Sequence, residues 1–108
     1  MKLNVYEGQN IVKTYETDEY NLKFGTLEDV ANAVNLDNLK TGSNEEYIKT
    51  AVDLLLHSMD TVKDLYKDIF PGITYEEIRK CTIAEMAVVL VDVVKYTIKL
   101  LSLGNRGN

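Results

Sequence analysis

The sequence predicts a single α+β domain in which a small N-terminal antiparallel β-sheet is followed by a predominantly helical C-terminal two-thirds. Two observations predict this class. Residues 3–24 alternate apolar and polar side chains around turn-forming residues, a pattern typical of strands. From Ser43 onward, apolar residues recur every three or four positions behind repeated capping patterns, which is typical of helices. With 108 residues, 45% of them hydrophobic, the chain has enough apolar material for one core.

The N-terminal segment is predicted to form a β-hairpin. Leu3 and Val5 alternate with polar neighbours, residues 7–10 supply turn-forming side chains, and residues 11–15 are β-branched or aromatic. A second alternation over residues 20–24 places three apolar side chains on one face of an extended segment. The sheet is therefore expected to be either a hairpin or a three-stranded meander.

A short helix is expected to follow, with Thr26 as its N-cap, acidic residues in its first turn and an end near Asn35. Residues 37–42 are polar enough to form a loop. Leu36 and Leu39 are expected to pack back against the core.

A long amphipathic helix begins at Ser43, where Ser43 and Glu46 have the spacing of a capping box. Its apolar residues lie along one line of the helix: Ile48, Val52, Leu55, Met59, Val62, Tyr66 and Ile69. Unbroken through Phe70, the helix would be about 40 Å long, more than a domain of this size comfortably spans. We therefore expect a break near Ser58.

The last third of the chain contains two more helices. Pro71 and Gly72 end the preceding helix, and Thr74 and Thr82 then each stand three residues before a glutamate, as in a capping box. The second of these helices is long and is expected to end at Gly104. We accordingly assign residues 1–104 to the domain and residues 105–108 to a flexible tail.

Charge and composition exclude several classes of protein. The net charge of −5 disfavours nucleic acid and anionic membrane surfaces as partners, because both are bound mainly through Lys and Arg. Cys81, the single cysteine, cannot form an internal disulfide. The chain shows no apolar signal segment, and Asp92 interrupts its most apolar helix, which argues against a membrane span. We expect a cytoplasmic protein.

Catalytic, cofactor and metal sites are not predicted. His57, the single histidine, falls opposite the apolar line of its helix and is expected to be exposed, and Cys81 is expected to be a small buried residue at a helix junction. One Cys and one His are too few for structural zinc. Three aspartates at a spacing of four residues are interleaved with lysines, which favours a solvated face over a cation site: Asp60, Asp64 and Asp68.

The last helix carries an apolar residue where a polar one is expected. Its polar side chains form one narrow stripe: Glu85, Asp92, Lys95, Lys99 and Ser102. Val88 falls inside this stripe and Tyr96 lies at its edge. Either the domain's own elements surround the helix, or another chain covers a surface made of Val88, Val89, Asp92 and Tyr96. The same surface could also close a homo-oligomer.

Two segments carry a resemblance to a known family. They are Asn-Leu-Lys-Phe-Gly at residues 21–25, and Ile-Phe-Pro-Gly-Ile-Thr at residues 69–74 with the acidic-then-apolar helix after it. With these segments and the order of its elements, the chain resembles the tail assembly chaperones of long-tailed phages and prophages of Gram-positive bacteria. The likeness extends over nearly all of residues 1–103.

The resemblance implies a non-enzymatic protein of the host bacterial cytoplasm. Such a chaperone binds the tape measure protein, keeps this long apolar helical chain soluble and helps recruit the tail tube protein. A small prophage-encoded regulatory or adaptor protein that acts through protein–protein contacts is the alternative. An enzyme centred on Cys81 is a third, weaker hypothesis.

Overall fold

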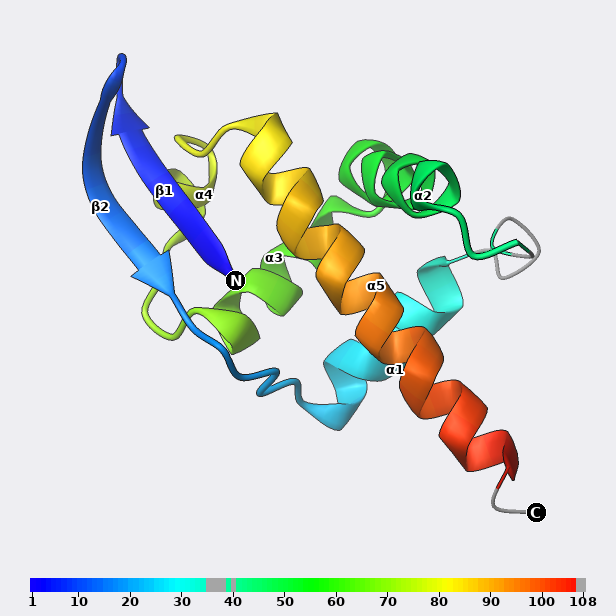
Figure 1. The fold of residues 1–108 in the computed structure, drawn as a ribbon. Coiled ribbons are helices and arrows are strands. Elements are labelled where there is room, and N and C mark those ends of the chain that lie inside the picture. The colour runs from blue at the N-terminus through cyan, green and yellow to red at the C-terminus, as the bar shows by residue number, and fades with distance from the viewer. Residues whose placement is uncertain (35–38, 40, 107–108) are drawn as a thin grey trace.

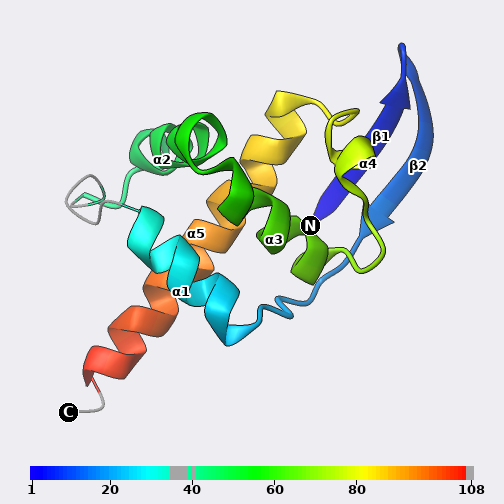
Figure 2. The same cartoon turned by 180° about the vertical axis from the view of Figure 1, so that it is seen from behind.

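The computed structural model describes residues 1–34, 39 and 41–106, and it has the predicted α+β architecture (Figure 1). The elements follow in the order β1 (Lys2–Glu7), β2 (Asn10–Glu16), α1 (Phe24–Ala33), α2 (Asn44–His57), α3 (Met59–Ile69), α4 (Tyr75–Ile78) and α5 (Ile83–Arg106). Helix α5 crosses the molecule, and the hairpin packs near its first turns. Seen from behind, α1 and α3 lie across α5 (Figure 2).

The predicted hairpin is confirmed. β1 and β2 pair antiparallel, with Leu3 opposite Tyr15 and an irregularity between Val5 and Tyr6. Gly8 in the turn has a φ of 63°, a conformation that glycine adopts without steric cost. Leu3 and Val5 are buried against the helices, whereas β2 is exposed along nearly its whole length.

The three-stranded meander is wrong. Within the described residues the sheet contains only β1 and β2, and residues 20–23 form no strand. The backbone N–H of Lys23 donates to the Asp68 carboxylate of α3 over 3.0 Å, so this segment is tied to a helix and not to a strand. Phe24, predicted to share one face of that strand with Tyr20 and Leu22, instead begins α1 and is 76% exposed.

Helix α1 begins three residues earlier than predicted, because Lys23 and not Thr26 occupies the N-cap position. Thr26 lies inside the helix and is buried, as is Val30. Leu39 packs against the core as expected. The predictions for residues 35–38, including Leu36, lie outside the described residues.

The predicted break at Ser58 is confirmed, since α2 ends at His57 and α3 begins at Met59. The capping box of Ser43 and Glu46 is also present. Of the predicted apolar line, only three residues, all in α3, are fully buried: Val62, Tyr66 and Ile69. In α2 the buried residues are instead Thr50, Ala51 and Leu54.

Helix α5 forms the centre of the core. Its buried side chains are Met86, Val89, Leu90, Val93, Val94 and Thr97. From α3, the Tyr66 hydroxyl donates a hydrogen bond to the Met86 carbonyl oxygen over 2.8 Å, which satisfies a polar group inside the core. The helix continues to Arg106, so the predicted end at Gly104 is wrong.

Candidate functional site

An apolar groove of about 370 Å³ lies between α2 and α5. It is lined from α2 by Asn44 and Ile48, and from α5 by Ala84, Ala87, Val88, Val91 and Asp92. Figure 1 looks onto α5 from the side opposite α1 and α3, with α2 beside it. We call this feature the α2–α5 groove.

The groove exists because small residues separate two larger ones. Ala84 and Ala87 carry too little volume to fill the space beside α2, whereas Ile48 and Val88 stand out from the two helices. Ile48 is 52% exposed and Val88 is 63% exposed. Large apolar side chains that gather at a hollow, unlike scattered ones, indicate a binding surface.

The exposed apolar surface of α2 continues beyond the groove. Ile48, Val52 and Leu56 follow one another at intervals of four residues, so they share one face of the helix, and all three are exposed. Ile83, in the first turn of α5, is exposed as well. The two helices that border the groove therefore both present aliphatic side chains to the outside.

One end of the groove is polar. Lys95 Nζ lies 3.4 Å from Asn44 Oδ1 and 5.2 Å from the centre of the Tyr47 ring, so this cation is held over the start of α2. Asp92 lines the groove beside it. In the part of the chain that the structure describes, no hydrogen bond or ion pair joins the Asp92 carboxylate to another side chain.

The structure separates the four residues predicted to form a partner surface. Val88 and Asp92 do line the groove, but Val89 has no exposed surface and belongs to the core. The Tyr96 ring stacks on Tyr20, with ring centres 4.4 Å apart and planes 5° apart. Tyr96 is thus half-covered by the chain itself, and the surface is narrower on α5 than predicted.

Sequence reasoning missed the α2 side of the groove. The sequence places Ile48 and Val52 on the same apolar line as the residues of α3, but α2 has its own orientation beyond the break at Ser58 and exposes both side chains. Within α2, Thr50, Ala51 and Leu54 follow at helical spacing and define the face that is buried. The more apolar face of α2 is the exposed one, so the pattern within this helix does not predict which face is buried.

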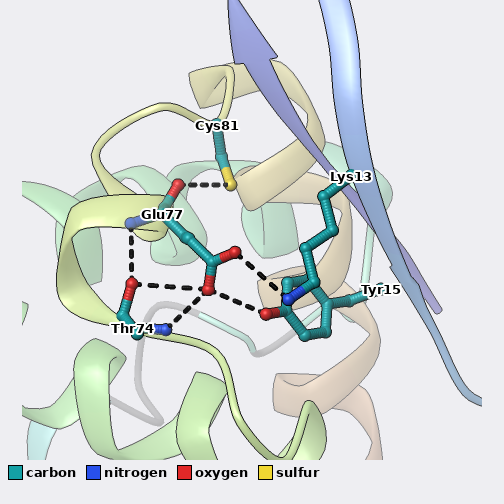
Figure 3. Close-up of polar contacts among 5 residues, drawn as sticks. All are labelled: Lys13, Tyr15, Thr74, Glu77 and Cys81. Atoms are coloured by element: carbon teal, nitrogen blue, oxygen red, sulfur yellow. Dashed lines mark hydrogen bonds and ion pairs between the residues drawn. The ribbon is translucent and has the colours of Figure 1, made fainter.

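Cys81 and His57 have the surroundings expected of structural and surface residues. The Cys81 thiol is half-buried and donates to the Glu77 carbonyl oxygen over 3.3 Å (Figure 3). Burial, together with the nearby Glu85 and Glu77 carboxylates, raises the pKa of Cys81 to about 11, so the thiol is protonated at neutral pH. His57 is exposed and lies 3.7 Å from Asp53.

A second group of polar contacts fastens the hairpin to the helices. Glu77 caps α4 through Thr74, and it also accepts a hydrogen bond from the Tyr15 hydroxyl of β2 over 2.7 Å (Figure 3). Glu85, in the first turn of α5, accepts from the Tyr6 hydroxyl and from the backbone N–H of Asn4. The Glu77 and Glu85 carboxylates therefore link the hairpin to α4 and α5.

The three aspartates of α3 are not gathered into a site. Lys63 Nζ lies 3.8 Å from Asp60, as expected for a solvated face, whereas Asp68 is engaged by Lys23 at 3.9 Å. Across the described ranges, no cluster of three or more His, Cys, Asp or Glu residues is placed to hold a metal ion. Nor does any helix in those ranges combine the length and apolarity that crossing a bilayer requires.

Comparison of the chain with protein-family models, with curated proteins and with solved structures finds no match. The role of the α2–α5 groove is therefore inferred from its shape, its lining residues and their charge.

Proposed function

We propose that this protein is a non-enzymatic chaperone of phage tail assembly, which works in the host bacterial cytoplasm, binds the tape measure protein and helps recruit the tail tube protein. The observation that carries the proposal is the α2–α5 groove, which is lined by Val88, 63% exposed, together with Ala84 and Ala87. The resemblance of residues 21–25 and 69–74 to this family of chaperones supplies the identity of the client.

The groove has the shape and polarity that an apolar helix needs. In helix-in-groove recognition, a partner helix lays its aliphatic side chains, spaced three or four residues apart, into a hollow between two helices. Ile48 from α2 and Val88 from α5 line the hollow with exposed aliphatic side chains, and the small Ala84 and Ala87 side chains leave room for those of a partner. The net charge of −5 favours solubility of this chain, because like-charged particles repel one another.

The proposal is tested by co-expressing the chain with the tape measure protein encoded in the same genome. We expect the tape measure protein to move from the insoluble to the soluble fraction and to co-purify with the chain. Val88→Lys should abolish much of this effect, because it places a charge where an apolar side chain docks. The far-ultraviolet circular dichroism spectrum should stay unchanged, since Val88 is exposed.

Val12→Lys is the matched control, because Val12 is 57% exposed but lies on β2, away from the groove. It introduces the same charge into a valine of similar exposure. The tape measure protein should remain soluble with this variant. If the wild-type chain leaves the tape measure protein insoluble, or if both variants act alike, the proposal is overturned.

A further inference from the structure

The charge at the edge of the α2–α5 groove indicates what kind of helix binds there. Asp92 is the charged residue among those that line the groove, and it is half-buried. The nearest cation on the same helix, Lys95, is turned toward Asn44 and the Tyr47 ring. Asp92 also lines a second hollow, together with Tyr20, Lys95, Tyr96 and Lys99. In the part of the chain described, no hydrogen bond or ion pair joins its carboxylate to another side chain, so its charge remains available at the edge of the α2–α5 groove.

We propose that the groove selects an amphipathic helix of the partner protein that carries Lys or Arg where its apolar stripe meets Asp92. This inference rests on the proposed function and adds the charge that the client helix must bear. The aliphatic stripe packs between Ile48 and Val88, and the cation pairs with Asp92. A helix with Glu or Asp at the same place brings two like charges together and is rejected.

A second copy of this chain is a poorer occupant. In a two-fold symmetric contact, the same surface appears on both sides of the interface. Asp92 is the charged residue that lines the groove, so two grooves placed face to face would each bring a negative charge to the interface. A partner helix with a cation gives charge complementarity instead.

The experiment uses two synthetic peptides of about 18 residues, or about five helical turns. Both are amphipathic helices of Leu, Ala and Gln, and they differ at one residue at the end of the apolar stripe, which is Lys in one and Glu in the other. Binding to the full chain is measured by fluorescence anisotropy at low ionic strength. We expect the Lys peptide to bind about fivefold more tightly, as for one partly exposed ion pair.

Variants of Asp92 assign this preference to the groove. Asp92→Asn should abolish the difference between the peptides, and Asp92→Lys should reverse it. Asp64→Lys is the matched control, because Asp64 is an exposed aspartate on α3 that does not line the groove. It should retain the wild-type preference. High salt should weaken the preference, because it screens exposed charges.

The possible failures are distinguishable. Equal binding of both peptides to the wild type, weakened by Val88→Lys, overturns the charge selection and leaves the proposed chaperone function standing. Binding of neither peptide also overturns the inference, while the co-expression experiment decides the function separately. Sedimentation velocity that reveals a dimer disrupted by Val88→Lys assigns the groove to a second copy and overturns the inference as well.

Discussion

The Tyr15 hydroxyl donates a hydrogen bond to Glu77 Oε1 over 2.7 Å, and it thereby joins two residues 62 positions apart in the sequence. Glu77 is at the same time the residue that completes the capping box of Thr74. Lys13, on the same strand as Tyr15, lies 3.5 Å from the other carboxylate oxygen. The start of α4 and the second strand of the hairpin are therefore held by one side chain.

The first prediction concerns this contact. Tyr15→Phe removes the donor and leaves a partly buried carboxylate oxygen with fewer partners, so the free energy of unfolding should fall by about 1 kcal/mol. Urea denaturation followed by circular dichroism measures the change. Tyr75→Phe is the control, because Tyr75 is an exposed tyrosine at the start of α4. A loss of equal size in both variants would contradict the role assigned to Tyr15.

The second prediction concerns the pH dependence of stability. The hydrogen bond from Tyr15 is the main cause that lowers the pKa of Glu77 below its usual value of 4.5. A carboxyl group whose pKa is lower in the folded state stabilises the fold above its unfolded pKa, and this stabilisation is lost as the pH falls through the folded pKa. The free energy of unfolding should therefore decline as the pH falls below about 4.5.

The contribution of Glu77 is separated by comparing wild type with Glu77→Gln across the same pH range. Glutamine does not titrate, so the decline in the free energy of unfolding should be shallower in the variant. Chemical denaturation at a series of pH values measures both curves. Parallel curves would mean that Glu77 has the same pKa in the folded and unfolded chains.

The third prediction concerns the reactivity of Cys81. A pKa of about 11, against the usual 9.0, lowers the thiolate fraction at pH 8 by roughly a hundredfold. Reaction with an aromatic disulfide reagent should therefore be about that much slower for the folded protein than for the urea-unfolded chain. A folded-state rate equal to the unfolded one would contradict the surroundings described for this thiol.

The fourth prediction tests which side of α5 is buried. Val89 has no exposed surface, so Val89→Ala should lower the free energy of unfolding by about 2 kcal/mol through lost burial and a cavity. Val88, its neighbour, is 63% exposed, and Val88→Ala should change stability by no more than about 0.5 kcal/mol. The same chemical change at adjacent positions gives a matched comparison by urea denaturation. Equal losses would contradict this placement of the two valines.

Local signals predicted the local structure well. The hairpin turn around Gly8, the capping boxes at Ser43 and Thr74 and the break at Ser58 depend on residues close together in the sequence, and all are present. The prediction of a third strand at residues 20–24 was wrong because this segment contacts a residue that is distant in the sequence. Asp68 binds the backbone of Lys23 from α3, a contact that no nearby residue indicates.

The groove could be predicted only from its α5 side. Val88 is an apolar residue within the polar stripe of a single long helix, so the sequence singles it out and leaves two alternatives, cover by the domain itself or by another chain. The structure shows that the domain leaves it 63% exposed. Ile48 lies on a helix whose buried face depends on how the chain turns at Ser58. Its exposure is therefore a property of tertiary packing, which a periodic pattern of apolar residues does not specify.

Glu77 and Glu85 belong to helices but accept hydrogen bonds from the hairpin, and this affects how the chain folds during synthesis on the ribosome. The hairpin is translated first, but Tyr6 and Tyr15 find their acceptors only on residues translated about sixty or more positions later. Until α4 and the first turn of α5 have emerged, the two strands lack the helices on which Leu3 and Val5 are buried. A two-stranded hairpin alone is marginally stable in water, so the first segment to be made is among the last to be secured.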